Sequence, residues 1–190
     1  MTPRQHKLGY FSSYDRGLQH LLEMWPLIKE SKPHAELHIA YGWELFLKGY
    51  QDNPERLAWK DKMDKLMTQE GITHHGRLSK TKLKELQQEC GIWAYPTDFG
   101  ETNCITALDC QASGCVPCTM NYAGLKETVQ SGIKLDGDIY EPSVKNDYLN
   151  ALVDLMNDEK RWEEEQKKGI EFARNYSWDN VASKWAEELV

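Results

Sequence analysis

The segment IWAYPTDFGETNCITALDCQASGCVPCTM, residues 92–120, decides the prediction of the fold. Its first four residues are apolar and aromatic and are followed by Pro96, which is typical of a short buried strand and its end. Small and apolar residues from 102 to 113 predict a helix that Gly114 ends. Residues 115–120 are again typical of a buried strand, so the segment predicts one strand–helix–strand unit.

The rest of the chain repeats this alternation on both sides of that unit. We expect strands at residues 7–11, 35–40, 71–75, 92–95 and 115–120, with 132–138 as a strand or loop. We expect helices at residues 18–31, 43–70 with a new start at Pro54, 79–90, 102–113, 123–129, 146–156, 159–175 and 178–189. This order predicts an α/β fold with a doubly wound, Rossmann-like parallel sheet. The chain would form one domain, 1–190, in which about 146–190 is a helical C-terminal extension.

The loops that follow the predicted strands should meet in one crevice. Ligands of open parallel sheets bind beyond the carboxyl ends of the strands. We therefore expect the ligand near five short stretches: Ser12–Gly17, Gly42, Gly76–Ser79, Pro96–Asn103 and Asn121–Gly124.

Composition narrows the class of protein. The 190 residues are 40% hydrophobic and 28% charged, with a net charge of −7, which argues mildly against nucleic acid as a partner. No apolar run approaches the roughly 20 residues of a membrane span, and the first residues lack the apolar stretch of a signal peptide. The five cysteines are therefore interpreted as reduced thiols of a cytoplasmic protein.

Two carboxylates frame the helix of the central segment. Glu101 lies at the turn from strand to helix, and Asp109 follows eight residues later. Eight residues make a little over two helical turns, so both side chains can face the same side. The free backbone N–H groups at the start of the helix, around Thr102, Asn103 and Cys104, suit a pyrophosphate. A pyrophosphate with hydroxyl-rich groups at both ends is the outline of a nucleotide sugar.

With these residues in place, the sequence resembles the retaining GT-B glycosyltransferases of the glycosyl transferases group 1 type. That family has a Glu, seven residues and a second Glu after a strand and a proline, and Asp109 stands here for the second Glu. The resemblance implies that Glu101 contacts the donor sugar as the catalytic carboxylate. It implies that Asp109 holds the ribose hydroxyls, with a side chain one methylene shorter than the family's.

Other stretches extend the resemblance over most of the chain. Residues 12–18 are similar to the family's phosphate-binding loop, in which Arg16-Gly17 matches a Lys-Gly pair and serines replace a second basic residue. Residues 76–79 are similar to the loop that frames the base, and 121–127 and 172–182 to a Gly-Gly-x-x-Glu turn and the closing segment. The donor-binding set implied is Ser12, Ser13, Arg16, Gly17, Gly76, Arg77, Leu78, Gly100, Thr102, Asn103, Cys104, Ile105 and Asp109.

The implied activity is hexosyl transfer with retention from a nucleoside diphosphate sugar. A GT-B enzyme has two such domains, so the resemblance implies a donor-binding C-terminal domain that is inactive without an N-terminal domain or partner chain. No cofactor is expected. No metal is expected either, on the interpretation that no Asp-x-Asp pair stands in a loop after a strand. The alternative is a non-catalytic module that binds a nucleotide or sugar nucleotide.

Simpler interpretations compete for several of these residues. A carboxylate pair on a helix is often only solvated, and Arg16 could form a surface salt bridge with Asp15 or Glu23. Cys115 and Cys118 have the spacing of a thioredoxin-like redox pair, but a helix precedes them and a strand follows, which is the reverse of the order that redox chemistry needs. We interpret the cysteines between 104 and 118 as buried thiols rather than zinc ligands, and the seven tryptophans as packing residues.

Overall fold

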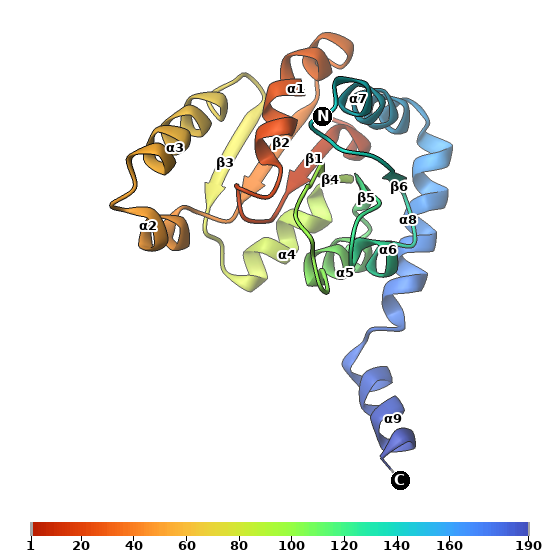
Figure 1. The fold of residues 1–190 in the computed structure, drawn as a ribbon. Coiled ribbons are helices and arrows are strands. Elements are labelled where there is room, and N and C mark those ends of the chain that lie inside the picture. Colours follow the sequence, from red (N-terminus) through yellow and green to blue (C-terminus); the bar gives the residue numbers. More distant parts are fainter. Residues whose placement is uncertain (1, 190) are drawn as a thin grey trace.

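A single sheet of parallel strands forms the centre of the molecule (Figure 1). The computed structural model describes residues 2–189. The strands are β1 Lys7–Tyr10, β2 Glu36–Ala40, β3 Ile72–Gly76, β4 Ile92–Tyr95, β5 Val116–Met120 and β6 Ile133–Leu135. They lie in the order β3-β2-β1-β4-β5-β6, and every pair is parallel. The predicted doubly wound sheet is confirmed, and its strand order reverses between β1 and β4.

Helices cover both faces of the sheet. They are α1 Leu18–Ser31, α2 Glu44–Tyr50, α3 Pro54–Leu66, α4 Lys80–Glu89, α5 Ile105–Ala112, α6 Leu125–Thr128, α7 Pro142–Asn157, α8 Glu159–Arg174 and α9 Trp178–Glu188. Helix α1 packs against α3 and α7 on one face, while α5 packs against α4, α6 and α8 on the other (Figure 1). The short 3-10 turn Arg4–His6 precedes β1.

Local sequence accounts for most of these elements. The apolar stripe predicted for the first helix is buried along α1, and all four residues of β4 are buried. Helices α4, α8 and α9 each begin with an N-cap side chain that accepts a hydrogen bond from a backbone N–H: Ser79, Asp158 and Ser177. A polar N-cap satisfies a donor that the helix itself leaves unpaired, so these three residues define where their helices begin.

Helix α5 begins later than predicted, at Ile105 instead of Thr102. The carbonyl oxygen of Glu101 accepts the N–H of Gly124 at 2.7 Å, so the backbone before the helix packs against the loop after β5. Gly124 permits this approach, because a Cβ there would lie 2.6 Å from the carbonyl oxygen of Thr102. The side of α5 that faces the sheet carries Ala107, Cys110 and Gln111, which leaves Ile105, Leu108 and Ala112 on the outer side.

The prediction that all seven tryptophans serve packing is wrong for the last two. Trp178 and Trp185 are 87% and 66% exposed on α9, whereas Trp25 and Trp93 are buried in the core. The helical spacing of the C-terminal segment is present, but α9 extends away from the rest of the molecule (Figure 1). Across residues 2–189, every helix is too short or too polar to cross a membrane.

The turn after β1 depends on a glycine in the left-handed region. Gly17 has a φ of 104°, and a Cβ there would lie 2.2 Å from the carbonyl oxygen of Pro96. This contact brings the loop after β1 against the loop after β4, the two strands between which the sheet reverses direction.

We predict that Gly17→Ala lowers the free energy of unfolding by about 2–4 kcal/mol, because it adds backbone strain to a steric clash with main-chain atoms. The matched control is Gly49→Ala in α2, where a Cβ has no neighbour within 4 Å. That control should change stability by about 1 kcal/mol or less and in the stabilising direction. Urea unfolding followed by circular dichroism measures both, and equal effects would contradict the role of Gly17.

Candidate functional site

An ion pair joins the loops after β1 and β4. Nη1 of Arg16 lies 3.1 Å from Oε1 and 3.4 Å from Oε2 of Glu101. The hydroxyl of Tyr95, at the end of β4, donates to the same Oε1 at 2.8 Å. The structure therefore brings together two residues that the sequence assigned separately, one to phosphate and one to the donor sugar.

Neighbouring groups hold both partners of this pair in place. The guanidinium of Arg16 lies over the ring of Phe99, 3.9 Å from its centroid. Burial raises the pKa of Tyr95, so its hydroxyl keeps its proton and remains a donor to Glu101. The Glu101 side chain is only 11% exposed and that of Arg16 33%, so their attraction is less screened than that of a surface pair.

The competing interpretation, in which Arg16 forms a surface salt bridge with Asp15 or Glu23, is wrong, because both acids pair with other residues. Asp15 pairs with Arg56 at 3.2 Å, and Glu23 pairs with Lys62 and Lys145. Arg16 turns away from both acids and toward the carboxyl ends of the central strands. The resemblance of residues 12–18 to the family's phosphate-binding loop singled out Arg16, but only the structure identifies Glu101 as its partner.

The two serines of the same loop are engaged in local hydrogen bonds. Ser12 is buried, with its hydroxyl 3.3 Å from that of Tyr95. The hydroxyl of Ser13 donates to Asp15 at 2.6 Å. Arg16 is thus the positively charged side chain that residues 12–17 present near Glu101.

A hollow of about 270 Å³ lies on the β1–β3 side of α5. Its lining includes Arg77 and Leu78, from the predicted base-binding loop, and Thr106 of α5. Gly76 precedes them with a φ of 64°, which starts the turn out of β3. Aromatic side chains Phe11 and Tyr41 complete a wall of mixed polar and apolar surface.

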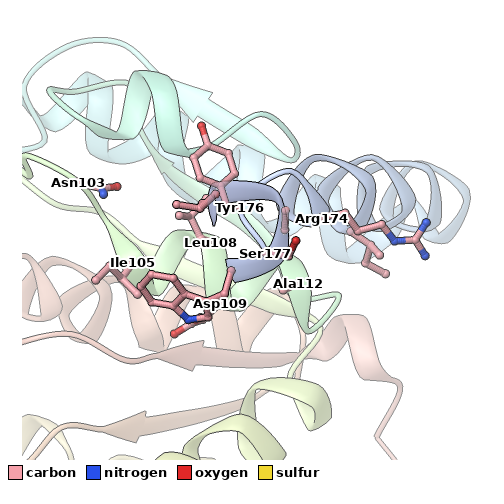
Figure 2. A pocket seen from close by; sticks show the side chains of 12 residues that line it. Asn103, Ile105, Leu108, Asp109, Ala112, Arg174, Tyr176 and Ser177 are labelled. Carbon is pink, nitrogen blue, oxygen red and sulfur yellow. The ribbon is translucent and has the colours of Figure 1, made fainter. Parts of the chain in front are cut away.

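A larger hollow, of about 590 Å³, lies on the opposite side of α5, against α8 and α9 (Figure 2). Three members of the predicted donor set line it: Asn103, Ile105 and Asp109. Arg174, Tyr176 and Trp178 also line it, and the sequence analysis assigned none of these three to a ligand. The resemblance of residues 172–182 to the family's closing segment marked this region, but it does not identify the side chains that lie against α5.

The predicted donor residues that precede α5 differ in how far their side chains are exposed. Thr102 and Asn103 are exposed, and Gly100 lies beside Tyr122. Cys104 is the N-cap of α5 and is 5% exposed, and burial raises the pKa of its thiol to about 11. Its side chain is therefore a neutral, buried group, and the backbone N–H groups of Thr106 and Ala107 point toward Cys104.

The redox interpretation of Cys115 and Cys118 fails on burial. Cys118 lies within β5 and Cys115 immediately before it, both buried, and all five cysteines are free thiols. Burial raises the pKa of Cys118 to about 12, whereas a redox thiol needs a lowered pKa and access to solvent.

One premise of the metal prediction is wrong. Asp136-Gly137-Asp138 is an Asp-x-Asp pair and follows β6 directly. Asp136 accepts a hydrogen bond from the Asn121 amide at 2.8 Å, and Asp138 accepts the N–H of Tyr140 at 2.9 Å. Within residues 2–189, no three His, Cys, Asp or Glu side chains converge closely enough to hold a metal ion.

Comparison with known proteins places this geometry in a family. The sequence matches the family described as Glycosyl transferases group 1 over residues 8–176. No curated protein sequence matches it. The pneumococcal O-GlcNAc transferase GtfA, solved with UDP and GlcNAc, is 14% identical, with a TM-score of 0.73 over 97% of this chain and 35% of that one. Anabaena HepE, solved with UDP-glucose, is 17% identical, with a TM-score of 0.71 over 97% of this chain and 48% of that one.

The chain belongs to the glycosyl transferases group 1 family, and its fold is that of a GT-B C-terminal-type domain. It spans 35% to 48% of the length of these two solved structures. The fold predicted from the sequence and the glycosyl transferases group 1 assignment are confirmed, whereas retention stays a prediction.

The environment of Asp109 predicts a pH dependence of stability. Burial raises the pKa of this carboxyl in the folded chain, while Lys84 and Lys80 oppose the shift. The folded state then holds the proton more tightly than the unfolded state, so Asp109 lowers stability as pH rises through its folded pKa.

We therefore predict that Asp109→Asn raises the free energy of unfolding at pH 7 and leaves it unchanged at pH 3. Urea unfolding at the two pH values measures the difference. An equal effect at both pH values would show that the carboxylate charge is not the cause.

Proposed function

We propose that this chain is the donor-binding half of a retaining glycosyltransferase and binds a nucleoside diphosphate sugar. The observation that carries the proposal is the ion pair of Arg16 with Glu101, a residue of the loop that leads into α5, the helix that two hollows flank. Family membership supports the reaction class. The UDP and UDP-glucose in the solved structures of GtfA and HepE support the class of donor.

Charge accounts for the proposed pyrophosphate site. Arg16 can form two hydrogen bonds to phosphate oxygens, and the start of α5 adds backbone donors and the positive end of the helix dipole. In the free protein Glu101 neutralises Arg16. An arriving pyrophosphate competes for the guanidinium, which leaves the Glu101 carboxylate available to a sugar hydroxyl.

The position of Asp109 constrains how the nucleoside lies. Asp109 borders the hollow beside α9, whereas Arg77 borders the hollow on the other side of α5. A nucleotide that contacts both crosses the first turn of α5, where Ile105 faces one hollow and Thr106 the other. In this pose the base lies near Arg77 and the ribose hydroxyls turn toward Asp109.

The proposed reaction needs more than this chain. In glycosyl transfer the bond from C1 of the sugar to the phosphate oxygen breaks, a bond from C1 to an acceptor hydroxyl oxygen forms, and the hydroxyl proton passes to the departing diphosphate. Arg16 and the start of α5 would stabilise the negative charge on the departing diphosphate. We place the remaining groups on an N-terminal domain or partner chain, and the protein in the cytoplasm.

One observation favours the second candidate, a nucleotide-binding module without catalysis. Ser12 and Ser13 are engaged with Tyr95 and Asp15, so the loop after β1 offers one cation near Glu101 and that cation is already paired. A module that only binds would retain nucleotide affinity and show no transfer when supplied with its partner.

We predict that Arg16→Gln weakens the binding of UDP, GDP and ADP alike. A charge-assisted hydrogen bond contributes about 1.5–3 kcal/mol, so affinity should fall about tenfold or more. Calorimetric titration measures it, with Arg161→Gln on α8 as the matched control. Unchanged binding in Arg16→Gln would remove Arg16 from the site.

We predict opposite effects of Glu101→Gln on the nucleotide and its sugar conjugate. Neutralising Glu101 releases Arg16, so UDP alone should bind as tightly as to the unaltered chain or tighter. UDP-glucose should lose the affinity advantage that its sugar gives. Glu85→Gln on α4 is the control, and equal weakening of both ligands would contradict a sugar contact.

A further inference from the structure

A third hollow, of about 380 Å³, lies at the carboxyl ends of β4, β5 and β6. It is lined by Thr97, Asp98, Met120, Tyr122, Gly137, Asp138, Ile139 and Tyr140. None of these residues lines either hollow beside α5, and none belongs to the proposed donor set. Asp98 and Glu101 nevertheless share one loop, and Gly100 lies beside Tyr122, so this hollow adjoins the Arg16–Glu101 pair.

The ring of Tyr140 is exposed and yet fixed. It is 64% exposed, but its hydroxyl donates to Asp98 at 2.8 Å and its N–H donates to Asp138 at 2.9 Å. The ring also meets buried His20 edge to face, with centroids 4.6 Å apart. Ordering an exposed side chain costs conformational entropy. Because the Tyr140 ring is already ordered in the free protein, a ligand that binds on it loses less free energy to this cost.

The chemistry of the lining selects a neutral, hydroxyl-rich ligand. Two aspartates line the hollow and neither Lys nor Arg does, so a phosphate or other anion is repelled. Carboxylate oxygens accept hydrogen bonds from hydroxyl groups, and charge-assisted bonds of this kind are short and strong. Tyr122 is 50% exposed and, with Tyr140, offers aromatic surface to the C–H groups of a sugar ring.

We propose that this hollow is a saccharide subsite for the acceptor, with Tyr140 as the stacking ring and Asp98 and Asp138 as hydroxyl acceptors. The proposal rests on the proposed function, because a saccharide held outside the proposed donor set but beside the Glu101 loop has a role there only as the acceptor of the transferred sugar. It gives this domain a share in acceptor recognition, in addition to holding the donor.

Saturation-transfer NMR tests the subsite on the full chain, with maltose, cellobiose and diacetylchitobiose as probes, each with and without saturating UDP. We expect at least one probe to bind, and Tyr140→Ala to weaken it about tenfold, since the stacking surface is lost. Tyr140→Phe keeps the ring but loses the bond to Asp98, so its loss should be smaller. Tyr50→Ala on α2 is the matched control, and circular dichroism shows that each variant is folded.

The outcomes separate this inference from the proposed function. UDP binding without any saccharide binding, or saccharide binding that Tyr140→Ala leaves unchanged, overturns the subsite alone. Saccharide binding at Tyr140 in a chain that binds no nucleotide overturns the proposed function and the acceptor role. Line broadening by Mn²⁺ centred on Asp98 and Asp138 would identify a cation site and overturn the saccharide assignment.

Discussion

The ion pair of Arg16 and Glu101 ties together the two loops between which the sheet reverses. Each residue belongs to a different half of the doubly wound fold, 85 positions apart in the chain. Gly17 permits the contact, because its left-handed backbone lies against Pro96 where a side chain would clash. The pair therefore depends on the close approach of β1 and β4, and the proposed chemistry depends on the pair.

Helix α5 organises the space around that pair. Its buried side packs Ala107, Cys110 and Gln111 toward the sheet, which turns Thr106 toward one hollow and Ile105 and Asp109 toward the other. Asp109 lies among the apolar residues of this outer side, where burial raises the pKa of its carboxyl.

The loop after β4 separates a basic side of the proposed site from an acidic side. On one side, in the proposed complex, Arg16 and the start of α5 would face the diphosphate. On the other side Asp98, with Asp138 from the loop after β6, presents carboxylates to hydroxyl groups. If both proposals hold, an anionic donor and a neutral acceptor approach the same loop from two directions and use different side chains.

The sequence by itself determined the strands, most helix limits and the family, because these depend on local periodicity, on N-caps such as Ser79 and Ser177, and on the spacing of Glu101 and Asp109. The tertiary structure decided the partner of Arg16, the hollow that Asp109 faces, the fixed ring of Tyr140 and the exposure of Trp178 and Trp185. These features arise where segments distant in sequence meet, or fail to meet. Periodicity tells which side of an element is apolar, but not which other element, if any, will cover it.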